Sequence, residues 1–223
     1  MRNPLAARAR RAGAPLRALP GPSGAGGGES VAHNAGTHRR RARDHAPELL
    51  ASALRKKAIA LLGLRGAGKS TIGEALARKL KIPFVELDQR IEEAAGLSLQ
   101  EIFALHGEDY YRRLERDVVD ALARDSKRLV CAASGGVVTN REAFDALRRS
   151  ATTVWLRALP EDHWNRVLSQ GDHRPMANDP LAMSRMRGLL AEREPLYARA
   201  DFQWDTSAHS LDESVQELAK ILR

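Results

Sequence analysis

The sequence predicts an α/β fold in which helices cover both faces of a parallel β-sheet. Short apolar runs alternate along the chain with segments whose apolar residues recur at helical spacing, and such alternation is typical of parallel sheets. A glycine-rich loop stands directly between the first apolar run and the first helical segment. With 223 residues in all, we expect one domain of ordinary size with room for an appendage.

Five short apolar runs are expected to form the strands, at residues 57–62, 84–86, 129–132, 152–156 and 202–205. Apolar residues at helical spacing predict a helix over 72–80, and the Arg, Glu and Leu content of 108–123 predicts another. Two further helices are expected to begin at capping boxes, formed by Thr139 with Glu142 and by Ser210 with Glu213.

The first 45 residues differ in composition from the rest of the chain. They hold nine Arg, no Lys and only two acidic residues, Glu29 and Asp44, which gives them a charge of +7. They contain no aromatic residue and only three leucines, too little apolar surface to offset the entropy of ordering. We therefore expect residues 1–45 to form a disordered basic extension and residues 46–223 to form the folded domain. We favour a dispensable extension, or a start codon assigned too early, over an organelle transit peptide.

Composition excludes several classes of protein. Beyond residue 45 there are 27 basic and 26 acidic residues, a balance of +1, so the domain offers no bulk signal for nucleic-acid binding. No apolar run approaches the roughly 20 residues that span a bilayer, and we expect no membrane partner. The single cysteine, Cys131, excludes an intramolecular disulfide framework and suits a reducing compartment. We expect a cytoplasmic protein and a monomer.

The glycine loop carries the clearest chemical signal. Residues 63–70 read Gly-Leu-Arg-Gly-Ala-Gly-Lys-Ser, a full match to the phosphate-binding pattern G-x-x-x-x-G-K-[ST]. The glycines let backbone amides face phosphate oxygens, and the positive end of the next helix adds to the attraction. We expect Lys69 to reach the β- and γ-phosphates and the Ser70 hydroxyl to hold Mg²⁺. The expected nucleotide-binding residues are Gly63, Gly66, Ala67, Gly68, Lys69, Ser70 and Thr71.

The rest of the sequence indicates which class of nucleotide-binding protein this chain represents. The chain has no Asn-Lys-x-Asp motif, the usual marker of guanine selection in GTPases. It is also short for a motor ATPase with sensor and coupling elements. A compact kinase of small molecules, with an acceptor site and a lid that excludes water, fits best.

In the order and spacing of its motifs, the chain resembles the shikimate kinases. The glycine loop is followed by Phe-Val-Glu-Leu-Asp-x-x-Ile-Glu at 84–92, Ile-Phe at 102–103, Arg-x-x-Glu at 112–115, Gly-Gly at 135–136, Arg-Pro at 174–175 and Arg-x-Pro-Leu-Tyr at 193–197. The resemblance covers about residues 57–222. It implies a P-loop NTPase of the nucleoside-monophosphate-kinase type with a five-stranded parallel sheet. It also implies transfer of the ATP γ-phosphate to the 3-hydroxyl of shikimate.

The same resemblance implies roles for particular residues. Asp88 would orient the attacking hydroxyl and accept its proton, and Arg112 and Arg193 would grip the shikimate carboxylate. Gly135 and Gly136 would present backbone amides to the substrate.

The resemblance also assigns the lid and a second metal ligand. Arg174, in a lid at 170–180, would close over the phosphates and stabilise developing charge. Glu86 stands where the family usually has the aspartate that helps to hold magnesium. Two more positions depart from the family pattern, with Ser134 in place of the first glycine of a triplet and Tyr111 in place of a phenylalanine.

An alternative function comes from the lid segment. Residues 170–176, Gln-Gly-Asp-His-Arg-Pro-Met, with Ala-Met at 182–183, resemble the shikimate-kinase-like domain of regulators that sense benzoyl-coenzyme A in benzoate catabolism. The chain before Lys57 leaves room for one short helix and not for a complete DNA-binding domain. Lys69, Ser70, Asp88 and Arg112 favour an enzyme, whereas Ser134 and the lid sequence favour a ligand-sensing domain. A kinase for another small hydroxylated acid stays open.

Overall fold

The described part of the chain contains a five-stranded parallel sheet with the strand order β2-β3-β1-β4-β5. The computed structural model describes residues 56–125, 127–169 and 181–223, so the predicted extension at 1–45 lies outside the described residues. The strands are β1 (Ala58–Leu62), β2 (Phe84–Glu86), β3 (Val130–Ala132), β4 (Ala151–Arg157) and β5 (Phe202–Asp205). All five predicted strands are present, and their ends differ from the prediction by at most one residue.

β1 lies in the middle of the sheet, with β3 on one side and β4 on the other. Its apolar residues alternate between two clusters of buried side chains, because successive side chains of a strand point to opposite faces. Leu62 belongs to one cluster and Leu61 to the other. A parallel strand that is covered on both faces reads as a continuous apolar run, which is why β1 could be predicted.

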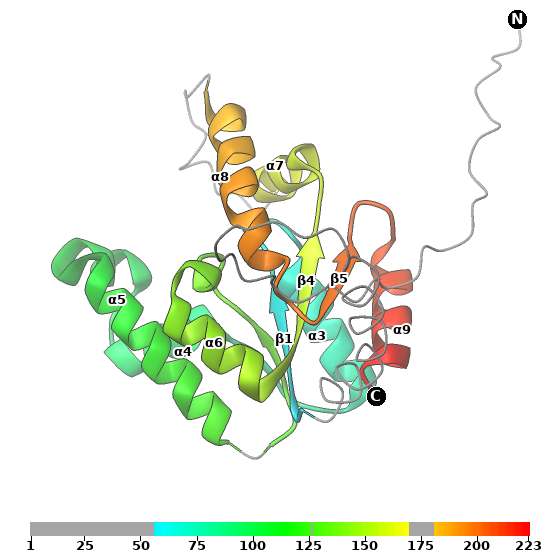
Figure 1. Cartoon of the computed structure of the whole chain (residues 1–223), viewed down its shortest axis with the longest axis horizontal. Helices are drawn as coiled ribbons and strands as arrows, with labels where there is room; N and C mark the ends of the chain where they lie inside the picture. Colours follow the sequence, from blue (N-terminus) through cyan, green and yellow to red (C-terminus); the bar gives the residue numbers. More distant parts are fainter. Residues whose placement is uncertain (1–55, 126, 170–180) are drawn as a thin grey trace, which may run out of the picture.

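Helices cover both faces of this sheet (Figure 1). On one face, α3 (Lys69–Leu80) packs beside α9 (Leu211–Ile221). On the other face, α4 (Leu87–Ala95), α5 (Leu99–Arg124) and α6 (Arg141–Ser150) pack against one another. Figure 1 shows α7 (Pro160–Ser169) and α8 (Ala182–Tyr197) beyond the arrowheads of the strands. The structure thus confirms the α/β prediction.

One of the two predicted capping boxes is present. Ser210 and Glu213 cap the start of α9 reciprocally. The box predicted at Thr139 is wrong, since α6 begins one residue later with Asn140 as its N-cap. The Thr139 hydroxyl instead donates to the Gly136 carbonyl oxygen at 2.7 Å, because Thr139 ends the short 3₁₀ helix η1 (Val137–Thr139) and its side chain turns back along that helix.

The helix predicted over 108–123 is the second part of a longer, kinked helix. α5 begins at Leu99 behind a capping box that Ser98 forms with Glu101. At Gly107 the backbone leaves helical geometry, with φ 77° and ψ −178°. Glycine adopts such a positive φ without steric cost.

No helix in the described ranges combines the length and hydropathy that a bilayer span requires.

Candidate active site

The loops that follow β1, β2 and β3 meet at the carboxyl edge of the sheet. In the sheet, β1 has β3 on one side and β4 on the other. The connection from β1 to β2 therefore leads toward one end of the strand order, and the connection from β3 to β4 leads toward the other end. In open α/β sheets, ligands bind in the crevice beside such a switch point. The glycine loop follows β1 at this edge, Asp88 follows β2, and Gly135 and Gly136 follow β3.

The glycine loop adopts a backbone that requires its glycines. Gly63, Gly66 and Gly68 have φ values of +145°, +78° and +92°. A Cβ on Gly63 would lie 2.7 Å from the Leu156 carbonyl oxygen, and one on Gly66 would lie 2.7 Å from the carbonyl oxygen of His163. The loop is therefore pressed against β4 and α7, and it leads directly into the N-terminus of α3, where Ser70 and Thr71 are exposed.

Lys69 spans the loop from the first turn of α3. Its Nζ donates to the carbonyl oxygens of Gly63 at 2.9 Å and Leu64 at 3.2 Å. Burial lowers the pKa of Lys69 to about 8, although the carboxylates of Asp88 and Glu86 act in the opposite direction. Both hydrogen-bond acceptors of the Lys69 ammonium group are neutral carbonyl oxygens. The group can exchange them for a phosphate oxygen, because a charged acceptor makes the stronger hydrogen bond.

Arg112 is fixed at the other side of the edge by a buried carboxylate. Its Nη1 donates to Glu115 at 3.1 Å and to the Gly136 carbonyl oxygen at 3.2 Å, while its Nη2 donates to Glu108 at 2.9 Å. Glu115 is fully buried and also accepts from the side-chain amide of Asn140 at 3.0 Å. Charged groups that are buried in this way need such partners.

Arg193 reaches the same turn from α8. Its Nη1 donates to the Gly135 carbonyl oxygen at 3.2 Å, and the Tyr197 hydroxyl donates to that oxygen at 2.5 Å. The two arginines expected to bind a carboxylate therefore hold consecutive carbonyl groups, although 81 positions separate them along the chain, as 193 − 112 gives.

The turn at Gly135 abuts the glycine loop. A Cβ on Gly135 would lie 3.5 Å from the Arg65 nitrogen and 3.8 Å from the Gly63 carbonyl oxygen. Asp88 lies in the first turn of α4, and its Oδ1 accepts from the Tyr111 hydroxyl at 3.3 Å. A carboxylate, two guanidinium groups and a phosphate-type loop thus come together at one edge of the sheet.

The sequence profile of the shikimate kinases matches residues 65–223. This chain belongs to the shikimate kinase family. It is 39% identical over 167 residues to the shikimate kinase of Symbiobacterium thermophilum, covering 74% of this chain and 95% of that one. It is 37% identical over 172 residues to that of Bradyrhizobium diazoefficiens, covering 77% and 82%.

Solved structures of shikimate kinases have the same fold. The enzyme from Acinetobacter baumannii in complex with shikimate superposes with a TM-score of 0.68 at 28% identity, covering 78% of this chain and 96% of that one. The enzyme from Aquifex aeolicus gives 0.60 at 31% identity, covering 74% and 95%. The five-stranded P-loop fold that the resemblance implied is therefore confirmed.

Two side chains near the glycine loop carry oxygen atoms of the kind that Mg²⁺ prefers. The Ser70 hydroxyl is exposed at the start of α3, and Glu86 ends β2 close enough to Lys69 to act on its pKa. Hydroxyl and carboxylate oxygens suit Mg²⁺ together with phosphate oxygens and waters. The described residues hold no group of three or more His, Cys, Asp or Glu side chains that could bind a metal ion.

Sequence reasoning missed the contacts behind the glycine loop. His163 of α7 is buried, and its Nδ1 donates to the Arg65 carbonyl oxygen at 2.9 Å. Arg166 donates to Thr206 at 2.9 Å and approaches the Gly66 carbonyl oxygen at 3.4 Å. The one available signal was a histidine at an apolar position of an amphipathic helix. Arg174 and the predicted lid lie outside the described residues.

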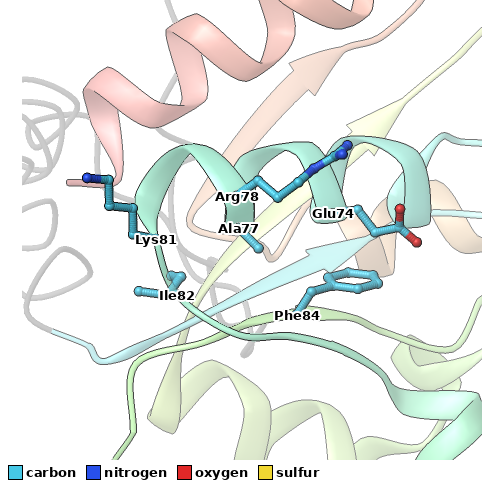
Figure 2. Close-up of a pocket in the computed structure, with 6 residues that line it drawn as sticks. All are labelled: Glu74, Ala77, Arg78, Lys81, Ile82 and Phe84. Atoms are coloured by element: carbon cyan, nitrogen blue, oxygen red, sulfur yellow. The ribbon is translucent and has the colours of Figure 1, made fainter.

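A separate surface pocket lies away from this edge. It has a volume of about 300 Å³ and is lined by Glu74, Ala77, Arg78, Lys81, Ile82 and Phe84. Figure 2 shows these side chains between α3 and the start of β2. They come from α3, from the connection that follows it and from the first residue of β2, so the pocket contributes no group to the phosphate loop or to the acceptor side.

Proposed function

We propose that this chain is a shikimate kinase, which transfers the γ-phosphate of ATP to the 3-hydroxyl of shikimate. The observation that carries the proposal is the packing of the Gly135–Gly136 turn against the glycine loop, with Arg112 and Arg193 held on the two carbonyl groups of that turn. An acceptor whose carboxylate is bound by both arginines would lie beside the nucleotide phosphates, as phosphoryl transfer requires.

Each of the predicted site residues has a defined task in the proposed reaction. The backbone amides of the glycine loop and Lys69 bind the ATP phosphates, with Lys69 exchanging its two carbonyl partners for phosphate oxygens. Asp88 orients the 3-hydroxyl of shikimate and accepts its proton as the oxygen attacks phosphorus. Mg²⁺, held by Ser70 and Glu86, would neutralise charge on the phosphate oxygens. Arg174 would add positive charge there when the lid closes.

The arginine pair supports an acceptor that carries a carboxylate. A guanidinium group can donate two parallel hydrogen bonds to a carboxylate, and both Arg112 and Arg193 are only partly buried. Gly135 and Gly136 have no side chain at this point, so the acceptor can approach the backbone closely. A Cβ on Gly136 would lie 3.2 Å from Nη2 of Arg112, which would crowd the binding group.

We also propose that the protein works in a reducing compartment, the cytoplasm, as a monomer. Cys131 is buried in β3, and burial raises the pKa of its thiol to about 12, so it packs as a small apolar residue and is not a nucleophile.

The proposal is tested with the purified full chain, Mg-ATP and shikimate in a coupled assay of ADP release. We expect ADP release to depend on shikimate and to fall at least about 100-fold in Asp88→Asn, since a general base contributes that much or more. Asp109→Asn, a change at an exposed carboxylate of α5, should leave the rate unchanged.

The same preparation tests the ligand-sensing alternative. The relatives reported above are named as kinases, and none of them as a regulator. Absence of shikimate-dependent turnover together with tight binding of benzoyl-coenzyme A in calorimetry would contradict the proposed function and establish the alternative.

A further inference from the structure

The hydroxyl of Tyr111 connects two functional carboxylates. It lies 3.3 Å from Oδ1 of Asp88, on α4, and 3.4 Å from Oε1 of Glu115, one turn further along α5. A phenol has a single proton to donate, so the two carboxylates share one donor. Tyr111 is only 6% exposed, and in such a site a hydrogen bond to a carboxylate is stronger than in water.

The position of the Tyr111 ring is fixed by its neighbours. The ring of Phe103 packs against it with centroids 4.8 Å apart, and the guanidinium carbon of Arg112 lies 5.4 Å from the ring centroid. Contacts of these kinds hold an aromatic side chain in one orientation. The hydroxyl is therefore presented to Asp88 from a rigid support.

Tyr111 keeps the proton that it donates. Burial, together with the charges of Asp88 and Glu115, raises the pKa of its hydroxyl.

The two oxygens of Glu115 are used differently. Oε2 accepts from Arg112 and from Asn140, whereas Oε1 faces Tyr111. Removing the Tyr111 hydroxyl would leave the hydrogen bond from Arg112 to Oε2 of Glu115 in place. Asp88, in contrast, would lose the one side-chain donor that the described contacts give it.

We propose that Tyr111 is a positioning residue, whose hydroxyl holds the Asp88 carboxylate in the orientation that receives the proton of the acceptor hydroxyl. This inference rests on the proposed function for the role of Asp88. It adds Tyr111 to the groups that determine the rate of phosphoryl transfer.

Tyr111→Phe tests the proposal directly in the full chain. We expect kcat to fall about tenfold, the value of one hydrogen bond to a charged group. The KM for shikimate should stay within about twofold because Arg112 keeps its partners. Tyr110→Phe is the matched control, since Tyr110 is the adjacent residue of α5 and its ring contacts His106 and Arg113. It should leave both parameters unchanged.

A crystal structure of Tyr111→Phe gives a readout that does not depend on turnover. We expect the Asp88 carboxylate to occupy a changed or a second orientation, whereas an unchanged single orientation would overturn the proposal. An unaltered kcat, or a KM that rises as kcat falls, would overturn it as well. If the native chain does not phosphorylate shikimate, the proposed function fails, and the orientation of Asp88 still decides the inference about Tyr111.

Discussion

Gly63 combines two constraints at one residue. Its φ is +145°, and a Cβ there would lie 2.7 Å from the Leu156 carbonyl oxygen of β4. Gly96, at the end of α4, has a φ of +66°, but a Cβ there would meet nothing within 4 Å. Substitutions at these two glycines therefore separate the free-energy cost of an unusual backbone conformation from that of a steric clash.

We predict that Gly63→Ala destabilises the protein more than Gly96→Ala. The exposed site should cost about 1 kcal/mol of unfolding free energy, the usual penalty for a left-handed residue with a Cβ. Gly63→Ala should cost at least about 1 kcal/mol more, because β4 or the loop must move. Urea denaturation of both variants measures the difference. Equal destabilisation would mean that the loop does not press on β4 as described.

Single residues with strict chemical requirements could be predicted from the sequence. The glycines of the loop, and Lys69 after them, stand within eight consecutive positions, so their spacing alone identified them. The amide partner of Glu115 could not be found in this way. Asn140 lies 25 positions from Glu115 along the chain, and nothing local indicates that its amide would point at a buried carboxylate.

At the scale of elements, α7 supports the nucleotide loop through His163. Burial lowers the pKa of His163 below its ordinary value of 6.5, and the nearby cations Lys69 and Arg166 act in the same direction. The folded state therefore holds a neutral histidine, whose Nδ1 donates to the Arg65 carbonyl oxygen. As the pH falls below 6.5, the unfolded chain takes up a proton that the folded chain resists, so stability is lost.

We predict that the melting temperature of the native protein falls more between pH 7 and pH 5.5 than that of His163→Gln. Glutamine keeps a donor for the Arg65 carbonyl oxygen and does not titrate. His106→Gln, a change at an exposed histidine of α5, should follow the native curve. If His163→Gln loses as much stability as the native protein over this range, His163 is not the group responsible.

The strands were the elements that the sequence predicted best. Buried parallel strands read as unbroken apolar runs, and their ends were predicted to within one residue. The first residues of the helices were harder to predict. Thr139 and Asn140 are both good N-cap residues, and the choice between them depends on the 3₁₀ turn at 137–139, a consequence of how the chain leaves β3. The first part of α5 was not predicted, because Gly107 interrupts its apolar pattern.

At the scale of the whole molecule, the strand order could not be derived from the pattern of the chain. Alternation of strands and helices fixes parallel pairing, but it leaves the position of each strand open. Parallel pairing puts the carboxyl ends of all five strands at one edge, and the order β2-β3-β1-β4-β5 matters for function because it makes the loops after β1, β2 and β3 neighbours there. The family resemblance implied the five-stranded sheet, and the structure shows how residues 63, 88, 112, 135 and 193 converge on that edge.

The proposed function requires that the loop after β1 holds a nucleoside triphosphate. Its most direct test is the affinity of the full chain for ATP, measured by calorimetry with Lys69→Ala and with Lys79→Ala, an exposed lysine of the same helix. We expect Lys69→Ala to bind ATP about 10- to 100-fold more weakly, because a charged hydrogen bond is lost, with an unchanged melting temperature, and Lys79→Ala to bind ATP as the native protein does. Native affinity for ATP in Lys69→Ala would show that the loop does not hold the nucleotide in this way.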